Sequence, residues 1–186
     1  PLELLNLVDC GNVACVPGEV ESAMATIECA VSEICHAGAV PVTMGGDGLV
    51  SLPQLRALSK VHTDLALVHI DAHTDTWDEF SGSKFMHGTP FRRACEDGLI
   101  DPMRTIQIGI RGAQETTEGW DYSLEQGMCV VFMEEFTKLG VKQIISEARR
   151  IVGEHPTYIS FDVDGLDPVY APGTGTPEVG GLTTIE

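Results

Sequence analysis

Basic residues are scarce in this chain: 11 lysines and arginines stand against 28 aspartates and glutamates, for a formal net charge of −17 at pH 7. That imbalance argues against nucleic acid or an anionic membrane as a partner, and it is compatible with metal ions or a small cationic substrate. No apolar run is long enough to span a membrane, and no signal-peptide pattern opens the sequence. We therefore expect a cytoplasmic protein, and a mitochondrial location stays open because a targeting segment could precede Pro1.

Two motif classes are also missing. None of the six cysteines forms a C-x-x-C pair, and a chain of 186 residues can bury a core without disulfides, so we expect reduced, mostly buried thiols. Neither G-x-G-x-x-G nor G-x-x-x-x-G-K-[ST] occurs, so Gly45 and Gly46 are better explained by a tight strand-to-helix turn than by phosphate binding. No repeat, linker or low-complexity segment divides the chain, which favours a single domain over residues 1–186.

Short apolar runs alternate with helical patterns along the chain. Strands are predicted at 4–8, 40–44, 65–70, 104–110, 129–132 and 158–161, and helices at 18–36, from Ser51 onwards, at 90–96, at 141–152 and from Thr183 onwards. Strands that alternate with helices imply a mainly parallel sheet covered on both faces. The predicted fold class is therefore α/β, with three layers in the order α/β/α.

Acidic residues follow two of these strands directly, as DAHTD at 71–75 and DVD at 162–164. Ligands gather at the carboxyl ends of parallel strands, and alternate residues of an extended segment share a face. Four converging carboxylates repel one another unless a cation neutralises them. Carboxylate and imidazole donors without thiolate favour Mn²⁺, with Ni²⁺ or Co²⁺ as alternatives. Either motif alone could be a solvated turn, but the two together predict a metal site.

Two other features leave alternatives open. His69 lies within a strand, one pleat deeper than Asp71 on the same face, and is expected to be packed or hydrogen-bonded rather than a ligand. The segment 76–86 is predicted to be a long loop, and loops of this length are often functional. Its aromatic and acidic residues could receive a cationic or alkyl tail, or could form a solvated loop with one packed tryptophan; they are Trp77, Asp78, Glu79 and Phe80.

These segments, together with several others, resemble the ureohydrolase family, which includes arginase, agmatinase and guanidinobutyrase. The matching segments, in the family's order, are GGD at 45–47, DAHTD at 71–75, HGTPFRR at 87–93, IQIGIRG at 106–112, SFDVDGLDP at 160–168, APGTGTP at 171–177 and GGL at 180–182. The resemblance runs from about Leu5 to the last residue. It implies an arginase-like fold and a homo-oligomer, either a trimer or a hexamer, with a hetero-oligomer possible.

The resemblance also implies a site with two Mn²⁺ ions. In it the metal ligands are Asp71 and Asp162 as bridges, Asp75 at the first ion, and His73 and Asp164 at the second. The metals would lower the pKa of a bridging water, and the resulting hydroxide would attack a guanidinium carbon while Asp75 orients it. By the same resemblance, His87 is the catalytic histidine that gives the leaving amine its proton, a task that suits imidazole near neutral pH.

This sequence departs from the family pattern in two ways. The family reads Gly-Gly-Asp-His, in which the histidine is a ligand of the first metal, but this chain has Gly48 at that position. Asp47 would then support the site by bonding backbone or a ligand histidine. The family is also longer, so the resemblance implies a partial chain that lacks N-terminal and C-terminal segments, including a glutamate that holds the substrate's guanidinium.

The predicted function is metal-dependent hydrolysis of a linear guanidino compound to urea and an amine. The segment 87–93 resembles the agmatinase and guanidinobutyrase branch, so agmatine or guanidinobutyrate is favoured over free arginine. The alternative is a metal-impaired, non-catalytic subunit that acts in a hetero-oligomer, because Gly48 provides no donor. A third hypothesis, a simple metal-binding module, is supported by the acidic residues alone.

Overall fold

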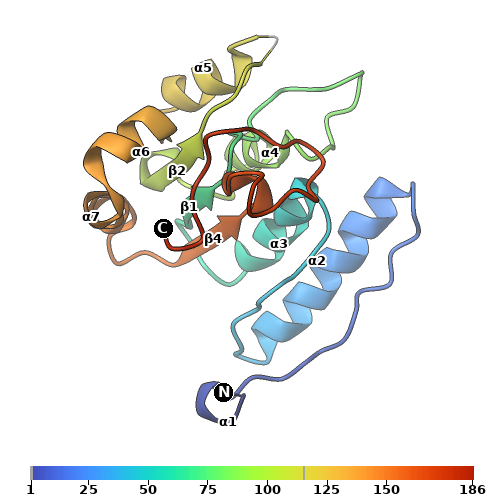
Figure 1. Ribbon diagram of the computed structural model, residues 1–186. Helices are drawn as coiled ribbons and strands as arrows, with labels where there is room; N and C mark the ends of the chain where they lie inside the picture. The colour runs from blue at the N-terminus through green and yellow to red at the C-terminus, as the bar shows by residue number, and fades with distance from the viewer. Residues whose placement is uncertain (1, 115) are drawn as a thin grey trace.

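A four-stranded parallel sheet forms the centre of the computed structural model, which describes residues 2–114 and 116–186 (Figure 1). The strands are β1 (Ala66–Ile70), β2 (Thr105–Ile110), β3 (Cys129–Phe132) and β4 (Thr157–Phe161), in the spatial order β3-β2-β1-β4. Each neighbouring pair is parallel. The predicted parallel sheet is thus confirmed, and β1 is a central strand with β2 and β4 on either side.

Helices cover both faces of this sheet. The helices are α1 (Leu2–Leu5), α2 (Val20–His36), α3 (Ser51–Leu58), α4 (Pro90–Glu96), α5 (Glu118–Glu125), α6 (Met133–Leu139) and α7 (Val141–Val152), with short 3-10 helices η1 (Gly48–Val50), η2 (Pro102–Arg104) and η3 (Val163–Gly165). Leu67 of β1 packs in one core cluster with α2, α3 and α4. Val68 and Ile70 face the other cluster, which includes α6 and α7. Alternation along β1 therefore divides the core into two layers.

Local sequence explains the helices that were predicted. Pro90 occupies the first turn of α4, where its missing N–H costs nothing. The helix predicted from Ser51 onwards begins at that residue, and η1 leads directly into it; Asp47 caps η1 by accepting a hydrogen bond from Leu49 N at 2.9 Å. The helices α5 and α6 were not predicted. Both are short, and α6 is followed by Gly140 at a positive φ of 76° before α7 begins.

Two predicted strands are wrong. Residues 4–8 contain the end of α1 and irregular chain, and residues 40–44 form no strand. The alternating apolar side chains of the second segment are largely in solvent, with Val40 87%, Val42 80% and Met44 95% exposed. A strand needs a hydrogen-bonded neighbour as well as an apolar pattern, and none of the described residues pairs with this segment.

A groove separates the unpaired segment at 38–48 from β4. It has a volume of about 900 Å³ and reaches Asp71 and Asp75 at the end of β1. Two apolar side chains of β4 remain exposed, Ile159 at 66% and Phe161 at 55%. Within the described part of the chain, β4 is therefore an edge strand whose outer side faces this groove.

The end of the chain also differs from expectation. Residues 182–186 are not helical, although Thr183 N donates to Glu186 Oε2 at 2.9 Å and Glu186 N donates to Thr183 Oγ1 at 3.4 Å, which are the reciprocal bonds of a capping box. Leu182 instead bridges to Leu166, beside η3.

The cysteines are free, as expected, but they are not mostly buried. Three are exposed and three are half-buried; they are Cys10, Cys15 and Cys29, and Cys35, Cys95 and Cys129 respectively. Among the residues described, no helix has both the length and the apolar character needed to cross a membrane.

Candidate metal centre

The two acidic motifs leave the sheet side by side. The last residues of β1 and β4, Ile70 and Phe161, are paired in the parallel register, and Asp162 N donates to Ile70 O at 2.9 Å. On the other side of β1, Asp71 N donates to Ile108 O at 3.0 Å. Gly109 permits this approach, because its φ is +99° and a Cβ there would lie 2.9 Å from the Asp71 carbonyl oxygen. The sheet therefore brings residues 92 positions apart to one edge.

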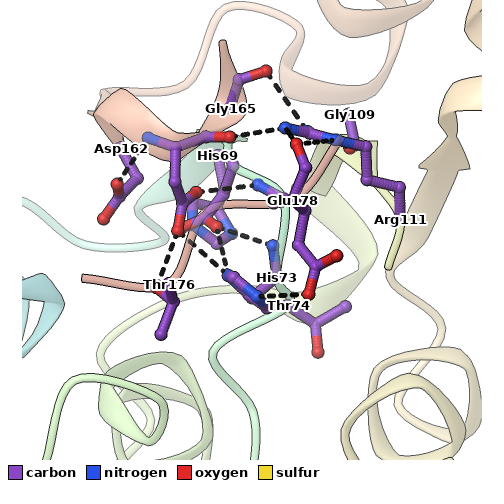
Figure 2. A network of polar contacts seen from close by, with 12 residues as sticks. His69, His73, Thr74, Gly109, Arg111, Asp162, Gly165, Thr176 and Glu178 are labelled. Carbon is purple, nitrogen blue, oxygen red and sulfur yellow. Dashed lines mark hydrogen bonds and ion pairs between the residues drawn. The ribbon is translucent and has the colours of Figure 1, made fainter. Parts of the chain in front are cut away.

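Three of the predicted ligands form one compact group: Asp71, His73 and Asp164. The Nδ1 atom of His73 lies 3.1 Å from Asp164 Oδ2 and 3.4 Å from Asp71 Oδ1. One atom from each side chain falls within 4.8 Å of the other two, a spacing that suits a single cation. Thr176 Oγ1 and Ala72 N each donate to Asp164 at 3.1 Å, so its carboxylate is held in place (Figure 2).

The electrostatics of this group favour a positive charge between the carboxylates. Burial alone would lower the pKa of His73, but hydrogen bonds and charges from Asp164 and Asp71 raise it to about 10. Burial would raise the pKa of Asp71, but the neighbouring His69 and the bonds to His73 lower it below its usual value. An imidazolium therefore supplies the cation in the metal-free protein, and a metal that binds here must displace its proton.

His69 is a hydrogen-bonded core histidine, as predicted. It is fully buried, its Nε2 lies 2.8 Å from Asp71 Oδ2, and its Nδ1 lies 3.2 Å from Gln107 Nε2. Because an amide nitrogen only donates, Nδ1 of His69 accepts and Nε2 carries the proton that is given to Asp71. Gln107 is fixed in turn by donating to Thr74 O at 2.6 Å.

A second group contains His69, Asp71 and Asp75, whose ligand atoms also lie within 4.8 Å of one another. Asp75 is buried, with a φ of 52°, and burial together with the charge of Asp71 raises its pKa well above the usual value. The imidazole of this group is already engaged with Asp71 and Gln107. The second group thus offers carboxylates but no spare nitrogen donor.

Among the described residues, neither Asp162 nor His87 is a member of these groups. The half-buried Asp162 accepts a hydrogen bond from Asp164 N at 2.9 Å and so caps η3, and burial raises its pKa. The His87 side chain is exposed. Its carbonyl oxygen lies next to Gly48, where an added Cβ would be 2.7 Å from that oxygen and 2.8 Å from Asp75 Oδ2.

The loop at 76–86 is anchored by its own charges. Asp78 Oδ1 accepts a hydrogen bond from Arg93 Nη2 at 2.7 Å, and Arg92 and Lys84 lie within 3.7 Å of the same carboxylate. These cations lower the pKa of Asp78, the Arg93 bond most strongly. Trp77 packs against Phe80 at a ring separation of 6.0 Å. The contact of Trp77 and the exposure of Glu79 fit a solvated loop with one packed tryptophan, whereas Asp78 is held by Arg93.

Two residues near the site were missed by sequence reasoning. Arg111 is 6% exposed and donates to six backbone carbonyl oxygens at 2.7–3.3 Å; these belong to Gly109, Asp164, Gly165, Leu166, Glu178 and Val179. Glu178 is partly exposed and points towards His73, as Figure 2 shows. Arg111 lies in a segment that resembles the family, but a buried arginine without a carboxylate partner has no sequence signature.

Comparisons with known proteins bear on the family and the fold. The chain is 48% identical to a guanidinopropionase of Pseudomonas aeruginosa, over all of this chain and 58% of that protein. It is 43% identical to the mitochondrial agmatinase of Gallus gallus, over all of this chain and 55% of that protein. The solved structure of proclavaminate amidino hydrolase from Streptomyces clavuligerus superposes with a TM-score of 0.91 at 40% identity, over 98% of this chain and 60% of that one.

The chain therefore spans about three fifths of the length of these relatives. The sequence model of the arginase family matches residues 1–186. This match, the parallel sheet and the structural similarity show that the chain belongs to the arginase family.

Proposed function

We propose that the whole protein hydrolyses a linear guanidino compound, of the agmatine or guanidinobutyrate type, to urea and an amine, and that it requires metal. The observation that carries the proposal is the group of Asp71, His73 and Asp164 at the carboxyl ends of β1 and β4. Similar proteins are named for guanidino substrates. The net charge of −17 is compatible with a cationic guanidinium group.

The donor chemistry fits a hard to borderline divalent ion, and we propose Mn²⁺. The second ion would be held by His73 and Asp164 together with Asp71 and Asp162. The first would be held more weakly, by Asp75 with the same two shared aspartates, because Gly48 offers no donor. Such ions supply Lewis acidity and lower the pKa of water. A cation at the first site would offset the burial and the neighbouring carboxylate charges, which together raise the pKa of Asp75 in the metal-free protein.

The chain's own residues would orient the reactants and move protons. Asp75, buried beside Gly48, would accept a hydrogen bond from the attacking water and orient it towards the guanidinium carbon. Collapse of the tetrahedral adduct breaks one C–N bond, and the leaving nitrogen needs a proton. His87 would donate that proton and recover it from solvent, since its side chain is exposed.

A second candidate function rests on Gly48. No side chain at this position can donate to a metal, and the backbone of His87 and the carboxylate of Asp75 have closed around it. We therefore keep the alternative of a metal-impaired subunit that assembles with an active relative in a hetero-oligomer. For the catalytic protein itself, a homo-oligomer, trimeric or hexameric, is proposed.

Urea release from agmatine, 4-guanidinobutyrate and 3-guanidinopropionate tests the first candidate. The full-length protein should release urea with Mn²⁺, should stop after chelation, and should lose activity in Asp164→Asn. Asp97→Asn is the matched control, because Asp97 is an exposed acid that forms a surface ion pair with Arg56. A full-length protein that binds Mn²⁺ but releases no urea from any of the three would contradict the first candidate and favour the second.

A further inference from the structure

The two ring nitrogens of His73 face different carboxylates. Nδ1 lies in the ligand group, 3.1 Å from Asp164 Oδ2. On the opposite side of the ring, Nε2 lies 4.0 Å from Glu178 Oε1 (Figure 2). A histidine that binds metal through one nitrogen usually donates the N–H of the other to a carboxylate, a carbonyl or water, which fixes the ring orientation. Glu178 occupies the place of that partner.

Glu178 is held in this place from two sides. Nη2 of Arg111 donates to the carbonyl oxygens of both Glu178 and Asp164 at 2.7 Å, so one guanidinium ties the two backbone segments together. The Glu178 carboxylate rests on Gly112, where a Cβ would overlap it. Gly112 also has a φ of +85°, a conformation that side chains rarely adopt. The sequence around the site therefore leaves room for this carboxylate and fixes its backbone.

We propose that Glu178 is a positioning residue, which orients the His73 ring so that Nδ1 presents its lone pair to a metal ion. The inference rests on the metal site of the proposed function. The 4.0 Å separation exceeds a direct hydrogen bond, so Glu178 acts after a shift of about 1 Å or through one water. Its side chain is 27% exposed, which leaves space for either.

A matched set of variants separates this role from a general effect of negative charge. Glu178→Ala removes the acceptor, Glu178→Gln keeps an oxygen at the same reach without the charge, and Glu178→Asp keeps the charge but is one methylene shorter. Glu154→Gln is the control, because Glu154 is an exposed acid in the turn after α7. The measurement is the affinity for the first equivalent of Co²⁺, followed by its visible absorption in a titration of the full-length protein.

The proposal predicts that Glu178→Ala weakens Co²⁺ binding by about 10–100-fold, the usual effect of losing such a partner. Glu178→Asp should lose nearly as much, and Glu178→Gln should lose the least of the three. An effect of charge alone gives the opposite order, with Asp close to the parent and Gln close to Ala, and that order would overturn the proposal. Equal binding by the parent and the three Glu178 variants would overturn it as well.

A second measurement reports on the His73 ring directly. In the Co²⁺-loaded protein, the ring N–H of a ligand histidine gives a shifted proton resonance, which we expect to exchange with solvent faster in Glu178→Ala than in Glu154→Gln. Unchanged exchange would contradict the positioning role. If the parent binds no Co²⁺, the metal-dependent function fails together with this inference, whereas normal Co²⁺ binding that is insensitive to residue 178 removes the inference alone.

Discussion

Gly48 provides the sharpest test of the site, because two substitutions there separate space from chemistry. A Cβ at this position would lie 2.7 Å from the carbonyl oxygen of His87 and 2.8 Å from Asp75 Oδ2, both closer than real Cβ contacts. The carbonyl belongs to backbone and cannot rotate away. Any side chain at 48 must therefore push the segments at 48 and 87 apart, and overpacking of this kind costs about 1–3 kcal/mol.

Gly48→Ala should carry this cost without any compensation. For a chain of this size, each kcal/mol shifts Tm by about 2–4 °C, so the metal-free variant should melt roughly 2–12 °C below the parent. Gly48→His should show a similar loss in EDTA. With Mn²⁺ at about 100 times the dissociation constant of the site that the new histidine completes, Mn²⁺ binding there stabilises the folded protein by up to about 2.7 kcal/mol. Of the two variants, only Gly48→His should therefore gain more Tm from Mn²⁺ than the parent does.

The assay is thermal unfolding of the parent and the two variants in EDTA and in Mn²⁺. Full recovery by Gly48→His, but not by Gly48→Ala, would show that the position can serve as a ligand once the backbone yields. A Gly48→Ala protein as stable as the parent would refute the steric argument. Equal responses of Ala and His to Mn²⁺ would refute the idea that residue 48 reaches the metal.

Three further outcomes are expected. At near-stoichiometric Mn²⁺, metal analysis after gel filtration should find closer to one ion than two per chain, since of the two groups among the described residues only that of His73 has a nitrogen donor not already engaged by Gln107; two tightly held ions would count against this. In the full-length protein, His87→Ala should lower the turnover rate by about 10²–10⁴-fold with unchanged metal content. A loss below about threefold would contradict the catalytic role and indicate an ordinary loop histidine. In EDTA, the pKa of His73 rises from its ordinary value of 6.5 to about 10 in the folded protein. The stability that His73 adds to the fold is therefore complete below about pH 6.5 and is lost as the pH rises towards 10. The parent's Tm should therefore fall over this range more steeply than that of His73→Gln, and parallel curves would contradict the pairing of His73 with Asp164 and Asp71.

Much of the fold could be predicted because its signals are local. The apolar runs that became β1, β2, β3 and β4 and the amphipathic pattern of α7 are read from neighbouring residues. The segment at 40–44 carries the same local signal and still forms no strand, because pairing depends on what lies beside it in space. The short α5 and α6 were missed because neither has a side-chain cap or a first-turn proline that marks its start, as Pro90 does for the equally short α4.

The site was partly predictable for a similar reason. The sequence shows that Asp71 and Asp164 each follow a strand, but only the sheet order places β1 beside β4 and so brings His73 between the two carboxylates. Arg111 and Glu178 could not be found, because their partners are backbone carbonyls and a ring nitrogen from distant segments. The catalytic and ligand roles themselves stay predictions until metal and activity are measured.

The exposed edge of β4 has a consequence for how this polypeptide behaves in solution. An edge strand with uncovered apolar side chains is a template for pairing with another chain, and Ile159 and Phe161 offer such a surface beside the groove. The net charge of −17 makes two copies repel each other. Dissolved salt screens this repulsion, and at 0.1 M salt charges more than about 10 Å apart hardly interact. Residues 1–186 on their own should therefore stay dispersed in dilute buffer and become turbid as the salt concentration rises, which is the reverse of the salting-in expected for a polypeptide with a covered edge.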